Sequence, residues 1–315
     1  MKAVCIREFG NVDVVKIEDK EIPIIQDQHD VLVEVHAASV NPIDWKVREG
    51  YFSDNSNDCF PFPMGWDFSG KIISIGNNVS KFKLGDEVYG LIRFFEPAGT
   101  FAEYVTAPSA QICLKPIHYD HVHAAASPLV SLTAWQALFE VANLQKNQTV
   151  LIHAAGGGVG QFAVQLAKWK GAKVIAIASS VSSELLISFG ADIFIDYKKE
   201  KFEDKVQNVD IVLNLVGDKD TALRSLNVMK NGGKIISFLG PHDPEVIAKA
   251  KAKNIEAVSM IVKPNGEQLG SITQLINDKL IKTTIEKTFP LDEVKAALNL
   301  VQNGHCHGKV VLKVK

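Results

Sequence analysis

A glycine-rich segment follows a short apolar run in the middle of the chain. The run 149–154 (TVLIHA) is typical of a buried strand, and it leads directly into Ala155, Gly156, Gly157, Gly158, Val159 and Gly160. Positions 155, 157 and 160 have the spacing of the dinucleotide-binding fingerprint, with alanine in the first place. Such a turn lets the backbone and the amino terminus of the next helix approach a pyrophosphate closely. The segment therefore predicts a dinucleotide site.

The end of the next predicted strand indicates which dinucleotide is bound. NAD is usually held by an acidic residue there, which binds the ribose 2′-hydroxyl. This strand ends instead in hydroxyl groups, those of Ser179, Ser180, Ser182 and Ser183, and the third strand ends at Tyr197. Hydroxyls can donate hydrogen bonds to a 2′-phosphate, so we expect NADP(H), with further contacts from Leu239 and Gly240. The alternative is a serine-rich surface loop without a phosphate role.

Six predicted strands alternate with helices around this loop, the pattern of a parallel sheet covered on both faces. They are 149–154, 173–178, 193–197, 209–217, 233–240 and 255–262. We predict an α/β fold with a doubly wound Rossmann domain of strand order 3-2-1-4-5-6.

The first third of the chain has a different texture, with short alternating runs such as 31–37 (VLVEVHA) and glycine-bounded turns. We predict a β-rich domain there. The segment after about 264 is too short to fold alone, so we expect it to pack on the amino-terminal block. The predicted domains are 1–120 together with 265–315, and a dinucleotide-binding domain over 121–264.

Composition restricts the partner and the compartment. The 315 residues carry a net charge of -2, which provides no electrostatic attraction for nucleic acid or an anionic membrane. Four cysteines occur without CxxC spacing, and no apolar run is long enough for a membrane span. We therefore expect a cytoplasmic protein with a small-molecule substrate.

The glycine loop, 151–160, is similar to the signature of the quinone oxidoreductase and zeta-crystallin branch of the medium-chain dehydrogenases/reductases. Other segments resemble this branch in the same order along the chain: 39–44 (SVNPID), 85–88 (GDEV), 131–135 (SLTAW), 190–192 (GAD) and 304–309 (GHCHGK). The resemblance implies a GroES-like β-rich catalytic domain around a Rossmann domain, and a homodimer formed through the last Rossmann strand. It also implies that Asn41 and Tyr51 line the substrate cleft and that Thr133 lies near the nicotinamide.

The zinc alcohol dehydrogenases of the same superfamily build their catalytic metal site from a cysteine and a His-Glu pair. At the matching positions this chain has Asp44 and the pair Trp66-Asp67, so the thiolate and imidazole ligands are missing. We expect no metal site, because His118, His121 and His123 stand where Asp120 would cap a helix. Without a Lewis acid, a quinone or the C=C of an α,β-unsaturated carbonyl is a better hydride acceptor than the carbonyl product of alcohol oxidation.

The residues leave alternatives open. Asn41 is also a suitable turn residue before Pro42, Tyr51 a suitable half-buried core aromatic, and Asp44 a suitable helix cap. Trp66 and Phe95 are candidates for an apolar wall facing a hydrophobic acceptor. The leading hypothesis is an NADPH-dependent, zinc-free quinone or enone reductase. The alternatives are a non-catalytic, crystallin-like NADPH-binding protein and an enoyl-thioester reductase.

Overall fold

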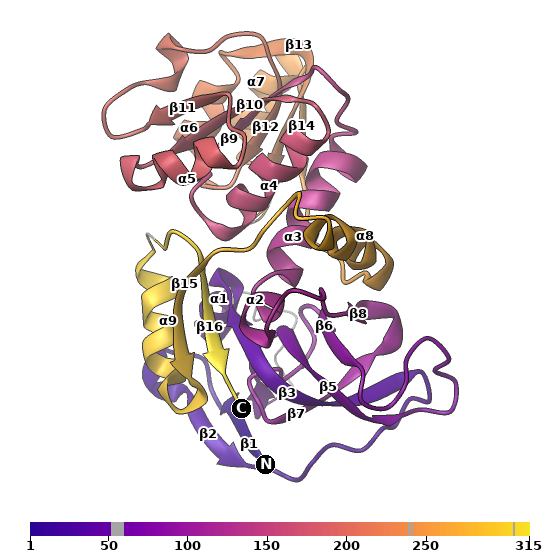
Figure 1. Ribbon diagram of the computed structural model, residues 1–315. Helices are drawn as coiled ribbons and strands as arrows, with labels where there is room; N and C mark the ends of the chain where they lie inside the picture. The colour runs from indigo at the N-terminus through magenta and orange to yellow at the C-terminus, as the bar shows by residue number, and fades with distance from the viewer. Residues whose placement is uncertain (52–59, 239, 241, 305) are drawn as a thin grey trace. The chain divides into compact units, whose positions relative to one another are not determined.

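The computed structural model describes residues 1–315 except 52–59, 239, 241 and 305. It divides the chain into two compact units (Figure 1). Unit 1 comprises Met1–Leu129, Lys263–Lys279 and Thr283–Lys315, and unit 2 comprises Val130–Val262 with Leu280–Lys282. Helix α3 (Pro128–Trp135) begins at the end of unit 1 and continues into unit 2.

Unit 1 is built on a mixed sheet of seven strands. Six of them follow the order β15 (Ile285–Pro290), β16 (Lys309–Lys313), β3 (Asp30–Val40), β5 (Asp67–Ile75), β6 (Glu87–Leu91), β8 (Ile112–Leu114), and β7 (Tyr104–Pro108) also pairs with β3. A smaller antiparallel sheet has the order β2 (Lys16–Asp19), β1 (Lys2–Ile6), β4 (Phe62–Pro63). The helices of this unit are α1 (Pro42–Arg48), α2 (His121–Ala125), α8 (Gly266–Asn277) and α9 (Val294–Asn303).

The alternation in β3 explains the core of unit 1. Val31, Val33 and Val35 are all buried, and they pack with Phe68 and Val88 of neighbouring strands. The carboxy-terminal strand β16 pairs antiparallel with β3, with Val310 opposite Val40. The end of the chain therefore completes the sheet to which the amino-terminal strand β3 belongs.

Unit 2 is a parallel sheet of six strands in the order β11 (Ile193–Asp196), β10 (Lys173–Ala178), β9 (Thr149–Ile152), β12 (Val209–Asn214), β13 (Met229–Ser237), β14 (Glu256–Ser259). In chain order this is 3-2-1-4-5-6, which confirms the predicted doubly wound topology. Its helices are α4 (Gly158–Trp169), α5 (Ser183–Ser188), α6 (Lys219–Ser225) and α7 (Pro244–Ala252), and a π-helix covers Gln136–Val141.

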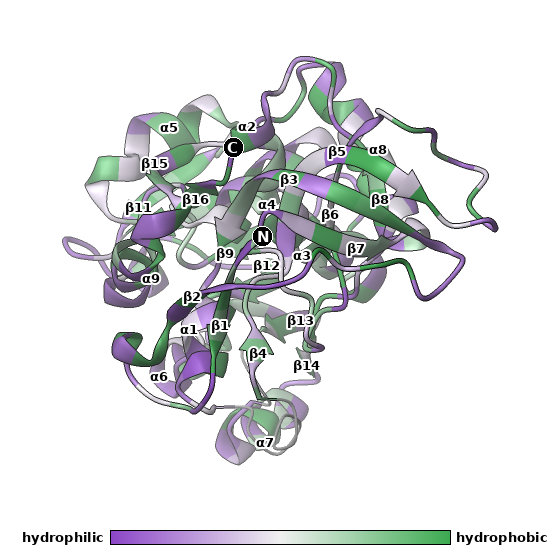
Figure 2. Ribbon diagram, turned by 90° about the horizontal axis from the view of Figure 1, so that it is seen from below, coloured by the Kyte–Doolittle hydropathy of each residue, from purple (hydrophilic) through white to green (hydrophobic). Residues whose placement is uncertain are grey.

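The central strands β10, β9 and β12 of unit 2 are almost completely buried, as a covered parallel sheet requires. Leu151, Ile175, Ile177, Val212 and Ile235 form one hydrophobic cluster with residues of the covering helices. Helix α7 carries hydrophobic and hydrophilic residues side by side (Figure 2), because only its Val246 and Ala250 stripe is buried. Among the described residues, no helix is both long and apolar enough to cross a membrane.

Candidate active site

The glycine loop lies between the first strand and the first helix of unit 2, where the fingerprint requires it. Ala154 has a left-handed backbone (φ 48°), and the Ala155 N–H donates to the Ile177 carbonyl at 2.9 Å. Gly157 then becomes the N-cap of α4, and Gln161 Nε2 donates to the Gly156 carbonyl at 2.8 Å. The first N–H groups of α4 lack intrahelical acceptors by geometry, so they are available to an anion.

The glycines of this loop differ in what a side chain would meet. A Cβ at Gly156 would lie 2.6 Å from Ser182 Oγ, and a Cβ at Gly160 would lie 2.5 Å from Ala155 Cα. At Gly157 the nearest atom would be a carbonyl oxygen at 3.5 Å, which is an ordinary contact. Gly156 and Gly160 are therefore required for packing within the protein, whereas the face of Gly157 is open to a ligand. This arrangement fits a pyrophosphate.

The serine-rich segment and the end of the third strand meet beside this loop. Ser182 is buried and lies against Gly156, while Ser180 is exposed and Ser179 is partly exposed. The Tyr197 N–H donates to the Ala178 carbonyl at 3.3 Å, which places the half-exposed tyrosine at the end of β10. The structure thus brings the predicted serines, Tyr197 and the glycine loop together within unit 2.

Charged residues next to Tyr197 were not identified from the sequence. Asp196 ends β11 and accepts from the Lys198 N–H at 3.0 Å, and Lys199 Nζ lies 3.5 Å from its carboxylate. The pKa of Asp196 is lowered, first by that backbone hydrogen bond, so the group is ionised. Lys198 and Lys199 place two exposed ammonium groups at this end of the sheet. The pair follows Tyr197 directly, so two consecutive lysines at the end of the third strand are the sequence signal for it.

Three other residues were predicted near the cofactor: Leu239, Gly240 and, on the nicotinamide side, Thr133. Gly240 has a backbone that favours glycine (φ 129°), and its carbonyl accepts from Ser237 Oγ at 3.2 Å beyond the end of β13. Leu239 lies outside the described residues. Thr133 lies on α3 and is mostly buried.

In unit 1, one of the two residues expected to line the substrate cleft, Asn41, belongs to a buried polar cluster. Asn41 is fully buried between β3 and α1. Its side-chain Nδ2 donates to Asp67 Oδ2 at 3.0 Å and to the Ser39 carbonyl at 3.3 Å, and its Oδ1 accepts from Lys309 Nζ. Its backbone N–H donates to Asp44 Oδ2 at 2.6 Å. The amide of Asn41 is therefore bonded within the protein on every side.

The two carboxyl groups of this cluster differ in their surroundings. Asp67 Oδ1 accepts from the Leu129 N–H at 2.9 Å and its Oδ2 accepts from Asn41, whereas Asp44 Oδ1 has no partner. Burial raises the pKa of Asp44 to about 8, and it raises the pKa of Asp67 to about 6. Burial also lowers the pKa of Lys309. Asp44, which accepts one hydrogen bond and has an unpartnered oxygen, therefore favours the neutral form more strongly than Asp67, which accepts two. Asp44 stands at the third position of α1 and bonds back to the N-cap, which agrees with the capping interpretation.

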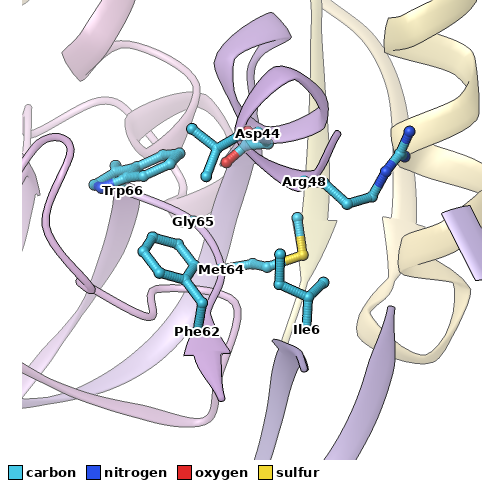
Figure 3. Close-up of a pocket in the computed structure, with 8 residues that line it drawn as sticks. Ile6, Asp44, Arg48, Phe62, Met64, Gly65 and Trp66 are labelled. Carbon is cyan, nitrogen blue, oxygen red and sulfur yellow. The ribbon is translucent and has the colours of Figure 1, made fainter. Parts of the chain in front are cut away.

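Apolar side chains surround this cluster. Ile6, Phe62, Met64 and Trp66 line a small void next to Asp44 (Figure 3). Trp66 is buried, and its indole N–H donates to the Glu96 carbonyl at 2.9 Å. The predicted wall also contains Phe94, which the sequence did not single out. Its ring lies 5.7 Å from that of Trp66 and 4.5 Å from that of Phe95.

Tyr51 is the most accessible of the residues predicted for the substrate side. It follows α1, its N–H donates to the Lys46 carbonyl at 3.0 Å, and its ring lies 5.8 Å from that of Trp45. The side chain is 66% exposed. Its hydroxyl is therefore accessible in a way that the Asn41 amide is not.

The donor set does not suit zinc. Among the described residues there is no group of three or more His, Cys, Asp or Glu side chains placed to hold a metal ion. Asp44 and Asp67 are engaged by protein donors, and the ammonium of Lys309 lies in the same buried cluster. His121 instead bonds Ser69 Oγ at 2.8 Å, and Asp120 caps α2 through the His123 N–H.

A sheet-based unit containing both chain ends, together with a doubly wound unit carrying a glycine loop, defines a dinucleotide-dependent dehydrogenase or reductase. Family models agree with this class: "Alcohol dehydrogenase GroES-like domain" matches residues 27–117, and "Zinc-binding dehydrogenase" matches residues 189–312. The second description fits the fold, but the residues described above do not form a zinc site.

Relatives match along the whole chain. A 2-methylene-furan-3-one reductase of Solanum lycopersicum is 34% identical, with 99% of this chain and 79% of the relative covered. An NADPH-dependent alkenal/one oxidoreductase of Arabidopsis thaliana is 33% identical over the same shares. The structure of the quinone oxidoreductase from Coxiella burnetii has a TM-score of 0.93 and 36% identity, covering 100% of this chain and 99% of that one. This chain belongs to the medium-chain dehydrogenase/reductase superfamily and is an oxidoreductase.

Proposed function

We propose that this protein is an NADPH-dependent, zinc-free reductase that delivers hydride to the C=C of an α,β-unsaturated carbonyl or to a quinone. The observation that carries the proposal is the combination of an open dinucleotide loop in unit 2 with a buried cluster in unit 1 whose carboxyl groups accept hydrogen bonds from protein donors. The relatives named as a furanone reductase, an alkenal/one oxidoreductase and a quinone oxidoreductase support the same acceptor class.

NADP(H) is the cofactor that the residues of unit 2 fit. The loop from Ala155 to Gly160 would hold the pyrophosphate, because Gly157 leaves space and α4 presents its amino terminus. Ser180 and Tyr197 would donate to the 2′-phosphate, and the ammonium groups of Lys198 and Lys199 would offset its charge. When bound, the reduced nicotinamide supplies the hydride.

The substrate side of the reaction needs a donor for the oxygen on which negative charge develops. Tyr51 is the best candidate, since its hydroxyl is exposed while the Asn41 amide is occupied. We propose that Asn41 contributes by fixing the β3–α1 junction, that Thr133 contributes on the nicotinamide side, and that Phe94 and Phe95 favour an apolar acceptor.

Two further expectations belong to this proposal. We propose a homodimer formed through β14, which is the terminal strand of the six-stranded sheet and offers an edge for pairing. We also propose a cytoplasmic location, although relatives include proteins named as mitochondrial or chloroplastic. Sedimentation and fractionation would test these points.

A panel of acceptors tests the function. Purified protein and NADPH are mixed, in separate assays, with a small quinone, an alkenal, an exocyclic enone or an enoyl thioester. In a further assay, protein and NADP⁺ are mixed with simple alcohols. We expect NADPH oxidation with quinone or enone and little alcohol oxidation. Turnover restricted to the enoyl thioester would favour the activity suggested by similarity to the CurK enoyl reductase (28% identity, TM-score 0.87). NADPH binding without turnover of any acceptor would favour a non-catalytic binding protein.

A further inference from the structure

Lys309 is a lysine buried at the start of the last strand. The residue is only 5% exposed, although lysine is rarely buried without a partner. Its Nζ donates to Asn41 Oδ1 and, at 3.2 Å, to the Val40 carbonyl. Val40 is the last residue of β3 and Asn41 follows it, and they are 269 and 268 residues away from Lys309 in the sequence. A charged group placed so deeply requires a compensating arrangement.

The Asn41 carboxamide provides that arrangement because it lies between opposite charges. Its oxygen faces the Lys309 ammonium, and its nitrogen faces the Asp67 carboxylate. The amide dipole therefore has one favourable direction, since a flipped amide would point its N–H groups at the ammonium and its oxygen at the carboxylate. Lys309 thus fixes the orientation of Asn41.

The charges in the cluster balance when one of its acids is neutral. The groups that face Lys309 are Asp67 on β5, Asp44 on α1 and Cys306 just before β16. Asp67 has two hydrogen-bond donors and Asp44 has one, with its second oxygen unpartnered next to a small void that is lined by apolar side chains and by Arg48. The geometry therefore favours an ionised Asp67 paired across Asn41 with Lys309, and a protonated Asp44.

This cluster is connected to the proposed substrate-side donor. Asn41 is the N-cap of α1, and the Tyr51 N–H bonds the Lys46 carbonyl near the other end of that helix. The Tyr51 ring packs edge-on against Trp45 of the same helix. A change at the N-cap therefore alters the helix to which Tyr51 is bonded and against which its ring packs.

We infer that Lys309 is a positioning residue for the reduction: by holding Asn41 between two charges it fixes α1 and, through α1, the hydroxyl of Tyr51. This inference rests on the proposed function, in which Tyr51 donates to the acceptor oxygen.

The test compares Lys309→Met with Lys313→Met, an exposed lysine on the same strand. For Lys309→Met we expect kcat with an enone to fall on the order of 10-fold to 100-fold, the scale on which a misplaced group costs turnover. The NADPH dissociation constant should stay unchanged, because the cofactor loop is in unit 2. Lys313→Met should keep wild-type kcat, and Lys309→Arg should recover part of the loss by keeping the charge.

A double-mutant cycle separates positioning from a general loss of structure. If Lys309 acts through Tyr51, Lys309→Met should have little further effect on kcat in a Tyr51→Phe background, since both changes remove the same interaction. Equal effects of Lys309→Met in both backgrounds would overturn the inference.

A second variant keeps the inference testable if Lys309→Met does not fold. In Lys309→Met/Asp67→Asn both buried charges are removed, so folding should recover while kcat stays low. Wild-type kcat in this folded double variant, or in Lys309→Met itself, would overturn the inference while leaving the proposed function intact. A wild-type protein inactive with every acceptor would overturn the proposed function, and this inference with it.

Discussion

The glycine loop of unit 2 is formed by one short segment of backbone, whereas the buried cluster of unit 1 is formed by side chains that lie far apart in the sequence. The loop uses backbone geometry within six consecutive residues, and its key feature is the space beside Gly157. The cluster uses ionisable side chains from three separate elements, α1, β5 and β16, arranged around the Asn41 amide at the β3–α1 junction. One site is therefore sensitive to added volume, while the other is sensitive to a change in charge.

The largest predicted effect is at Gly157. Gly157→Val should weaken NADPH binding by at least about 100-fold, because the new side chain would occupy the space of the pyrophosphate. Gly157→Ala should weaken binding less, and its melting temperature should stay near that of the wild type, since its Cβ meets only one atom at 3.5 Å. Fluorescence titration measures the affinity. Wild-type affinity in both variants would place the pyrophosphate elsewhere.

At Gly160, unlike at Gly157, an added methyl group should lower the stability of the protein. A Cβ there would lie 2.5 Å from the backbone of Ala155. Gly160→Ala should therefore lower the free energy of unfolding by about 1–3 kcal/mol, the usual cost of overpacking. Denaturant unfolding of the two alanine variants side by side measures the difference. Equal stability of both variants would remove the distinction between the two glycines.

On the substrate side, Tyr51→Phe should lower kcat on the order of 10²-fold if its hydrogen bond forms mainly in the transition state. NADPH affinity should not change. Tyr104→Phe is a suitable control, because that tyrosine lies on β7 with its hydroxyl 3.5 Å from Glu34. The measurement is steady-state kinetics with one enone. An unchanged kcat in Tyr51→Phe would exclude Tyr51 from the mechanism.

The preference for NADPH over NADH should be a smaller effect than those predicted above for Gly157→Val and Tyr51→Phe. NADPH should bind about tenfold more tightly than NADH, a difference of roughly 1.4 kcal/mol. The double variant Lys198→Ala/Lys199→Ala should reduce this ratio, whereas Lys205→Ala, which removes an exposed lysine paired with Glu200, should not. The readout is the pair of dissociation constants for each protein. An unchanged ratio in the double variant would show that the serines and Tyr197 suffice.

Titrating groups in the two units should change the free energy of unfolding in opposite directions as the pH rises. Asp44 and Asp67 have raised pKa values of about 8 and about 6, so the folded state binds more protons than the unfolded state and stability falls as pH rises from about 4 to these values. Burial lowers the pKa of His153 to about 4, so its contribution is lost as pH falls from about 6.5 to about 4.

Asp44→Asn should therefore flatten the fall in unfolding free energy between pH 6 and pH 8. His153→Gln should reduce the loss between pH 6.5 and pH 4, and should leave the alkaline side unchanged. Urea unfolding over this pH range measures both slopes. Slopes identical to those of the wild type would show that these groups titrate normally in the folded protein.

The sequence predicts the local site far better than the distributed one. The strand order of unit 2 and the position of the glycine loop follow from apolar runs and glycine spacing, and both were predicted. The cluster depends on the register that places Lys309 beside Asn41, which no local pattern specifies. The resemblance implied that Asn41 lines the substrate cleft, with a turn before Pro42 as the alternative, and its full burial became evident only from the structure. Similarly, Phe94 was overlooked because its contact with Trp66 depends on the turn after β6.

We expect hydride transfer to proceed without a metal at the cluster of Asn41, Asp44, Asp67 and Lys309. The most direct measurement is the zinc content of the purified protein together with its NADPH-dependent enone reduction before and after exhaustive chelation. We predict no stoichiometric zinc and the same kcat after chelation, because the carboxylates are already engaged by protein donors. One tightly held zinc per chain, with activity lost on chelation and restored by zinc, would contradict the account.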